Sequence, residues 1–175
     1  MRLVRPSILC KDSFLESYKT IVAESNSHFF RIPVDPDNFQ QYCDTYIGYE
    51  KGIGLPEGFV NDTVLWLVEG TEYIGNISIR HRLTDHLLKV GGHIGYLISP
   101  KHRNKGNGTK ILELGLKEAA KLGLKKVLVT CNKTNIASAR IIEKNGGVLE
   151  NEIFAEAEKL WKKRYWIDIS GPKQL

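Results

Sequence analysis

One short stretch of the chain combines arginine, lysine and glycine in a way that suits an anionic ligand. It reads Arg103-Asn104-Lys105-Gly106-Asn107-Gly108-Thr109. Glycine lets the backbone come close to a ligand, and the free N–H groups of a helix's first turn, at the positive end of its dipole, attract anions. If a helix begins here, the stretch predicts a site that holds phosphate.

The residues on either side predict a strand before this turn and a helix after it. Ile94, Tyr96 and Ile98 alternate with period two, as expected for a strand, and the pattern stops at Pro100. After the turn, an apolar row at helical spacing runs up to Gly123 and consists of Leu112, Leu116, Ala119 and Leu122. The glycines are therefore expected to lie at a helix entrance.

Two common phosphate-binding patterns do not fit the turn. A Walker sequence places lysine directly after its second glycine, but Gly108 is followed by Thr109 and only then by Lys110. A dinucleotide fingerprint needs a third glycine three residues further on, where Ile111 stands. The form Arg-x-x-Gly-x-Gly after a strand instead resembles the pyrophosphate-binding turn of the GNAT superfamily of acyl-CoA-dependent N-acyltransferases.

A second segment strengthens this resemblance. Residues 135–147 are similar to the GNAT segment that follows the fifth strand, where asparagine is followed by small and apolar residues, Tyr-Glu-Lys and a closing Gly-Phe. The matching residues are Asn135, Ile141, Glu143, Lys144 and Gly146. Two positions depart from the pattern. Ile142 occupies the position of the tyrosine that protonates the departing thiolate in many members, and Gly146-Gly147 replaces the closing Gly-Phe. The resemblance covers about residues 64–170.

The resemblance implies an acetyl-CoA-dependent N-acetyltransferase with no metal, which moves an acetyl group to an amine of a small molecule or peptide by direct attack in a ternary complex. It implies that the amides of residues 103–109 cradle the pyrophosphate, with added charge from Arg103 and Lys105. Ile98 and its neighbours would pair with the pantetheine arm, and Asn135 and Ser138 would contact the pantetheine or adenosine end. The cofactor-binding set is thus Ile98, Arg103, Asn104, Lys105, Gly106, Asn107, Gly108, Thr109, Asn135 and Ser138.

The catalytic residues are less sharply indicated. His93 is a candidate base because an ordinary histidine pKa of ~6.5 suits a proton acceptor near neutrality, and it is expected to point into the same region as Tyr96. The competing interpretation is a hydrogen-bonded packing histidine. Tyr96 and Tyr165 are candidate replacement acids, although strand tyrosines commonly belong to the core. Three further candidates have a plainer explanation as solvated turn residues or a buried thiol: Glu69, Glu72 and Cys131.

Further along the chain, the patterns predict the remaining elements. An edge strand is expected within Leu3–Leu9, a helix from Asp12 or Ser13 to about Ser25, a second helix from Asp35, and a loop from Gly48 to Asn61. A hairpin near Glu69-Gly70 follows, with a break at Thr84-Asp85-His86. The last elements are a buried strand at Lys126–Cys131, a helix from Asn135 and two strands, at 148–154 and 164–169.

This order predicts an α/β (α+β) fold of the GNAT type. It has three layers, α-β-α, around a mixed and mostly antiparallel sheet of about seven strands, with about four helices. The 175 residues, of which 42% are hydrophobic and 26% charged, are expected to form one domain, 1–175. The three cysteines are odd in number and without a Cys-x-x-Cys, which argues against a disulfide framework and a zinc site. With neither an export signal nor an apolar run of the ~20 residues that span a bilayer, the chain is expected in the cytoplasm without a membrane partner.

Other function classes remain open. The net charge of +5 admits nucleic-acid binding, but the cations are scattered and no nucleic-acid partner is expected. A non-catalytic acyl-CoA-binding or sensing module is the main alternative, favoured by Ile142 and by the lack of an obvious carboxylate base. Arg80-His81-Arg82 either forms a solvated face or lines an acceptor cleft that prefers acidic groups. The family resemblance also suggests a homodimer formed through the last strands, but no residue of this sequence indicates one.

Overall fold

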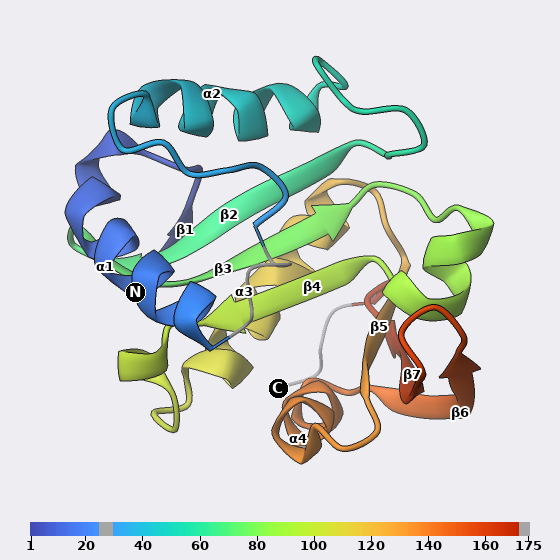
Figure 1. Cartoon of the computed structure of the whole chain (residues 1–175). Coiled ribbons are helices and arrows are strands. Elements are labelled where there is room, and N and C mark those ends of the chain that lie inside the picture. Colours follow the sequence, from blue (N-terminus) through green and yellow to red (C-terminus); the bar gives the residue numbers. More distant parts are fainter. Residues whose placement is uncertain (25–29, 172–175) are drawn as a thin grey trace.

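A computed structural model of the chain describes residues 1–24 and 30–171, and it places seven strands in one sheet of order β1-β2-β3-β4-β5-β7-β6 (Figure 1). The strands are β1 (Arg2–Val4), β2 (Asp62–Glu69), β3 (Glu72–Arg80), β4 (Ile94–Ile98), β5 (Lys126–Asn132), β6 (Val148–Ala155) and β7 (Leu160–Asp168). The α-helices that frame the sheet are α1 (Lys11–Ala23), α2 (Phe39–Glu50), α3 (Asn107–Lys121) and α4 (Ile136–Lys144).

The sheet is antiparallel everywhere except between β4 and β5. These two strands run parallel and pair at a single position, Ile94 with Val129. Antiparallel β7 then joins β5 along its whole length, and β6 follows at the edge. Figure 1 shows β5 turning away from β4 beyond their meeting point, so the sheet opens between its two halves.

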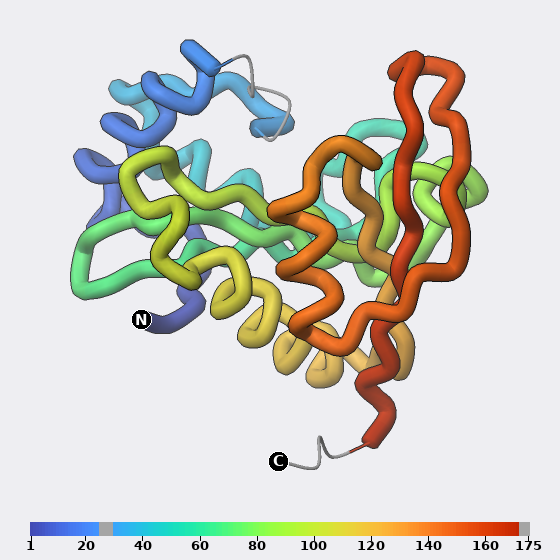
Figure 2. Tube along the Cα trace, turned by 90° about the horizontal axis from the view of Figure 1, so that it is seen from below, coloured from blue at the N-terminus to red at the C-terminus, as the bar shows by residue number. Residues whose placement is uncertain are grey.

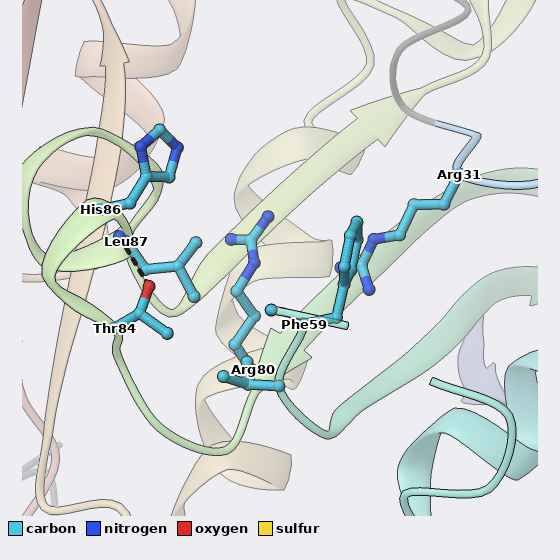
Figure 3. A pocket seen from close by; sticks show the side chains of 8 residues that line it. Arg31, Phe59, Arg80, Thr84, His86 and Leu87 are labelled. Atoms are coloured by element: carbon cyan, nitrogen blue, oxygen red, sulfur yellow. Dashed lines mark hydrogen bonds between the residues drawn. The ribbon is translucent and has the colours of Figure 1, made fainter. Parts of the chain in front are cut away.

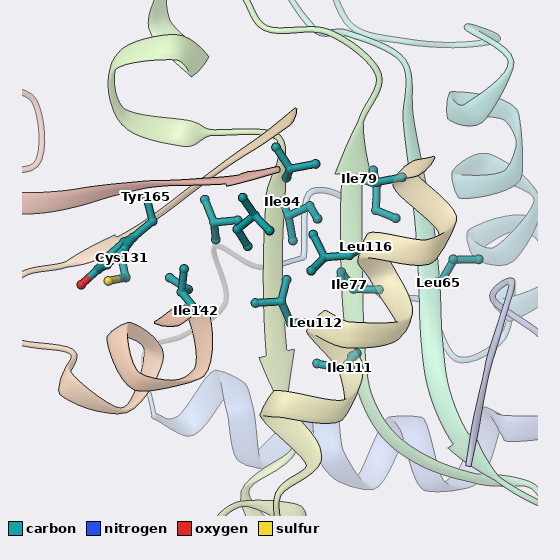
Figure 4. Close-up of a cluster of buried hydrophobic side chains, with 14 of the residues drawn as sticks. Leu65, Ile77, Ile79, Ile94, Ile111, Leu112, Leu116, Cys131, Ile142 and Tyr165 are labelled. Carbon is teal, nitrogen blue, oxygen red and sulfur yellow. The ribbon is translucent and has the colours of Figure 1, made fainter. Parts of the chain in front are cut away.

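Helices cover both faces of the sheet, which gives three layers (Figure 2). On one face, α3 and α4 bury Leu112, Leu116 and Ile142 against the isoleucines of β3 and β4 (Figure 4). On the other face, α1 and α2 pack an aromatic cluster around Trp66. Seven of the eight residues of β2 are buried because both faces of this strand are covered.

A glycine allows α3 to lie close to the sheet. A Cβ built on Gly115 would come within 2.2 Å of Cδ1 of Ile77 in β3. The packing of buried apolar side chains from α3, β3 and β4 therefore fixes where the start of α3 stands relative to the end of β4. The anion-binding turn expected from the sequence lies between these two elements.

The order of elements predicted from the sequence is confirmed, and the differences concern boundaries. The strand expected within Leu3–Leu9 stops at Val4, because Pro6 follows, and Ile8–Cys10 forms a 3₁₀ turn. The second helix begins at Phe39 and not at Asp35, because Asp35 accepts the Asp37 N–H at 2.9 Å in a turn of its own.

Three further boundaries move. The helix expected to reach Ser25 is described as far as Ala23, and Ser25 lies outside the described residues. The loop expected from Gly48 starts after α2 ends at Glu50. The long helix α3 ends at Lys121, which leaves Leu122 38% exposed and outside the apolar row to which it was assigned.

Candidate active site

A groove of about 390 Å³ lies where β4 and β5 separate. Because β4 pairs with β5 only at Ile94, its edge beyond that residue has no strand partner among the described residues. One wall of the groove is this free edge, another is α4, and the turn before α3 closes one end. The groove is lined by Tyr96, Leu97, Ile98, Arg103, Asn104, Gly108, Asn135, Ala137, Ser138 and Ile141.

His93 stands at the point where the two strands meet. Its backbone N–H donates to the carbonyl of Leu128 at 2.7 Å, and its Nδ1 accepts the Leu128 N–H at 3.0 Å. Gly92, with φ of +67°, permits this approach, since a Cβ there would lie 2.6 Å from the same carbonyl oxygen. The imidazole also contacts the ring of Trp166, at 6.3 Å between centroids.

This placement leaves His93 poorly suited to act as a base. An Nδ1 that accepts a hydrogen bond leaves the proton of the neutral ring on Nε2, so neither nitrogen is free to take another. Burial, with a smaller contribution from the charge of Arg80, lowers the pKa of His93 to about 4. His93 does not line the groove, and the structure does not bring it together with Tyr96.

The turn before α3 presents uncapped backbone to the groove. Gly106, in the left-handed region at φ +78°, is the N-cap and offers no side chain, and the first turn of α3 contains no acidic residue. Gly108 allows the Ile141 side chain to come close, since a Cβ there would lie 2.5 Å from Cδ1 of Ile141, and both residues line the groove. First-turn amides without a capping side chain are what the anion site expected from the sequence would require.

The side chains of the turn have more varied contacts than the sequence suggests. Arg103 forms a two-point ion pair with Glu24, at 2.7 and 3.2 Å, and donates from Nε to the Ile98 carbonyl. Lys105 is exposed and reaches the carbonyl of Lys101. The amide of buried Asn107 donates to the carbonyl of His102, which holds the loop in place. Lys105, Gly106, Asn107 and Thr109 lie beside the groove and do not line it.

The other end of the groove holds a pair of hydroxyl groups. The Tyr96 hydroxyl lies 2.9 Å from Oγ of Ser138, and Asn135 caps α4 by accepting the Ser138 N–H at 3.0 Å. Burial raises the pKa of Tyr96 to about 12, so the phenol is protonated at neutral pH. Ile142, at the position of the usual family tyrosine, is a residue of α4 and is fully buried in the core between this helix and the sheet.

The remaining sequence candidates lie outside the groove. The Tyr165 hydroxyl donates to Glu143 at 2.9 Å, and its ring is fully buried. Glu72 pairs with Lys101 at 2.7 Å and with His102 at 2.9 Å. Burial raises the pKa of the Cys131 thiol.

Sequence reasoning missed part of the site. Ala137 and Ile141 line the groove from α4, and the position of Ile141 four residues after Ala137 and three after Ser138 was a usable signal. The partner of Arg103, Glu24, is 79 residues away and had no local signal. A second cavity lies beside Arg31 and Arg80 (Figure 3); a cleft at Arg80 was one of the two alternatives left open by the sequence, but nothing in the sequence indicated that Arg31 would join it.

Two negative findings apply to residues 1–24 and 30–171. They contain no cluster of three or more His, Cys, Asp or Glu side chains arranged to hold a metal ion. Within the same ranges, every helix is too short or too polar to cross a bilayer.

Comparison with known proteins relates the chain to acetyltransferases. The family model described as acetyltransferase (GNAT) domain matches residues 12–148. Among curated proteins, no sequence matches the chain.

Solved structures share the fold. YncA of Salmonella typhimurium, with acetyl-CoA, is 17% identical with a TM-score of 0.63, over 100% of both chains. RimL, a ribosomal L7/L12 α-N-protein acetyltransferase with CoA, is 14% identical with a TM-score of 0.69, over 98% of this chain and 97% of its own. A point mutant of the spermidine N-acetyltransferase SpeG of Vibrio cholerae is 16% identical with a TM-score of 0.63, over 96% of this chain and 95% of its own.

Proposed function

The chain belongs to the GNAT acetyltransferase family, and from this premise we propose that it transfers an acetyl group from acetyl-CoA to an amine of a small molecule or peptide, by direct attack in a ternary complex. The observation that supports this best is the groove that runs from the uncapped start of α3, along the free edge of β4, to the hydroxyl pair. RimL and SpeG act on acceptors as different as a protein α-amine and spermidine. The acceptor must therefore be argued from this chain's own residues.

The start of α3 would hold the pyrophosphate of the donor. Backbone N–H groups from Gly106 to Thr109 point away from the helix without capping acceptors among the described residues, and the helix dipole adds a positive field. Arg103 can add its charge only if it exchanges Glu24 for phosphate. Asn104 lines the groove, and Lys105 beside it can reach a phosphate from the solvent side.

The free edge of β4 would bind the pantetheine arm as an added strand. Beyond Ile94, this edge lacks the β5 ladder, so backbone groups near Ile98 can pair with the amides of the arm. With the arm paired in this way, the thioester would lie near Tyr96, at the far end of the groove from the turn. Asn135 and Ser138 would contact the arm from the α4 side.

Tyr96 and Ser138 would stabilise the leaving thiolate. With a pKa of about 12, Tyr96 is a weaker acid than an ordinary thiol, whose pKa is ~8.5, so full proton transfer to the thiolate is unfavourable. A hydrogen bond from the phenol to the sulfur is the contribution that remains. This assigns Tyr96 to charge stabilisation and explains how a chain with Ile142 at the usual position can still catalyse transfer.

The acceptor amine would attack in its neutral form. The residues that line the groove include no carboxylate and no imidazole, and Nδ1 of His93 accepts the Leu128 N–H, which leaves the ring proton on Nε2. We therefore propose that solvent carries the amine proton away and that His93 serves as a structural residue.

A thermal-shift titration with acetyl-CoA tests the donor site first. At 100 times its dissociation constant a ligand adds about 2.7 kcal/mol, or about 5–10 °C for a domain of this size. Gly108→Glu places a carboxylate in the groove and should abolish the shift. Ala120→Glu, which adds the same charge at an exposed position near the other end of α3, should retain it.

Turnover then separates an enzyme from a binding module. Release of free thiol with a panel of amines, dependent on Tyr96, supports the transferase. A normal acetyl-CoA shift without thiol release for any amine favours the non-catalytic module, and the absence of a shift at millimolar acetyl-CoA contradicts the donor site itself.

A further inference from the structure

The second cavity, of about 390 Å³, lies on the face of the sheet that α1 and α2 cover. In β3, Ile77 and Ile79 face α3, so by strand alternation Ser78 and Arg80 face the opposite side. Figure 3 shows Arg80 with its side chain directed into the cavity between Leu87 and Phe59. The lining consists of Arg31, Gly58, Phe59, Val60, Arg80, Thr84, His86 and Leu87.

The two arginines of this cavity are compensated unequally. Arg31 pairs with the fully buried carboxylate of Asp62 at 2.7 Å and donates to Ser78 at 2.9 Å. Arg80 donates from Nη1 to the carbonyls of Gly91 and Gly92, at 3.2 and 2.9 Å. Within the described residues, its Nε and Nη2 have no hydrogen-bond acceptor, and no carboxylate lies within ion-pair distance of it.

The cavity therefore carries an excess positive charge. Two guanidinium groups share one carboxylate, and that carboxylate is already bonded by Arg31 and Ser78. Burial, and next the charge of Arg31, lowers the pKa of Arg80 to about 10, which leaves it protonated at neutral pH. A partly buried cation without a counter-charge is an unfavourable arrangement that an anionic ligand would relieve.

The position of the cavity connects it with acetyl transfer. Gly95 in β4 pairs with Ser78, and a Cβ built on Gly95 meets no atom within 4 Å. The sheet is thus uncovered one residue from Tyr96. Arg80 donates its backbone N–H to the carbonyl of His93, which is two residues, or about 7 Å along a strand, from Gly95.

Building on the proposed transfer, we infer that the acceptor amine carries an anionic group, a carboxylate or a phosphate, which Arg80 binds in this cavity with help from Arg31. Guanidinium presents paired N–H groups that match both anions. The separation of about 7 Å along the strands favours an acceptor whose amine and anion are several bonds apart. Adjacent placement, as in the α-amino carboxylate of a free amino acid, fits less well.

Matched acceptors test this inference directly. The probes are 4-aminobutanoate, 3-aminopropyl phosphate and the neutral 4-aminobutanamide, each with saturating acetyl-CoA. Since a hydrogen bond to a charged group changes affinity by about tenfold or more, both anions should exceed the amide in kcat/KM by at least about tenfold, chiefly through KM. The ratio of carboxylate to phosphate identifies which anion the cavity prefers.

Variants locate the effect at one guanidinium. Arg80→Gln should bring the anion-to-amide ratio of kcat/KM close to one. Arg80→Lys, which retains charge without the paired N–H groups, should give an intermediate ratio. Arg82→Gln removes the same charge from an exposed residue that does not line the cavity, and the ratio should persist. A ratio near one in the unaltered protein, or a ratio that survives Arg80→Gln, overturns the inference.

A binding measurement decides the matter if none of the three amines is turned over. In the CoA-saturated full chain, the Nε–H NMR signal of Arg80 should shift saturably with millimolar inorganic phosphate or succinate. If the Arg80 signal does not shift, the proposed anion site is wrong. The acetyl-CoA thermal shift reports the donor site separately, so failure of the anion site and failure of acetyl-CoA binding give different results.

Discussion

Replacing Tyr96 by phenylalanine removes only a hydroxyl group, one that lies 2.9 Å from Oγ of Ser138 at the inner end of the groove. With a pKa of about 12, Tyr96 is assigned a hydrogen bond to the thiolate and not a complete proton transfer. A hydrogen bond to a charged group contributes about 1.5–3 kcal/mol, which corresponds to a decrease of about 10–150-fold in kcat. If Tyr96 instead donated its proton completely as a general acid, its replacement could lower kcat by up to about 10⁴-fold.

The assay is thiol release under saturating acetyl-CoA with the best amine of the panel, and Tyr165→Phe is its matched control. Tyr165 is another strand tyrosine with a bonded hydroxyl, donated to Glu143 at 2.9 Å, but it is fully buried outside the groove. Its loss removes one hydrogen bond to the carboxylate of exposed Glu143, which water can then solvate, and should cost about 0.5–1.5 kcal/mol of stability. The two variants should therefore separate: Tyr96→Phe lowers kcat with little change in Tm, and Tyr165→Phe lowers Tm with kcat within about twofold.

The pH profile adds an independent check. Because Tyr96 keeps its proton up to about pH 12, it should cause no fall in kcat between about pH 7 and pH 10. In that range the rate should rise as the acceptor amine loses its proton. A Tyr96→Phe enzyme within about twofold of the unaltered kcat, or an alkaline limb that disappears in this variant, would refute the assigned role.

Three further predictions concern stability. The pKa of His93 is about 4 in the folded protein, below the ~6.5 of the unfolded chain, so between these pH values the unfolded state binds the extra proton. The stabilisation is therefore fully present above about pH 6.5, and the free energy of unfolding should fall by about 3 kcal/mol toward pH 4. Urea titrations at a series of pH values should show this slope, and His93→Gln should flatten it. Asp62→Asn leaves Arg31 without its buried partner and should cost about 3 kcal/mol in chemical denaturation, and an unchanged midpoint would contradict the pairing. Gly115→Val drives methyl groups into Ile77 and should cost about 1–3 kcal/mol, whereas a neutral effect would mean that α3 can shift outward.

The sequence predicted those features whose cause is local. The period-two spacing of Ile94, Tyr96 and Ile98 identified β4, because successive side chains of a strand project to opposite faces. The apolar row of α3 was correct up to Ala119 and wrong at Leu122, where the helix has already ended. Such patterns depend on neighbours in the chain, so they are visible without a structure.

Contacts between distant segments were not predictable in the same way. Arg103 lines the groove, but its ion pair with Glu24 joins the end of α1 to the turn. The cavity of Arg31 and Arg80 unites a segment before α2 with the end of β3. Neither arrangement leaves a periodic pattern, because each depends on how the helices pack on the sheet.

His93 shows why a reactive residue type does not by itself identify a function. Imidazole chemistry made this residue a candidate base, yet its Nδ1 and its backbone N–H both engage Leu128, one residue before the only point at which β4 and β5 pair in the described chain. By joining the strands there, His93 fixes the apex from which the groove opens. In the proposed transfer its contribution would be geometric: a shift of this apex would move the free edge of β4 relative to α4, and with it the distance from Tyr96 to Ser138 on which the proposed thiolate stabilisation depends.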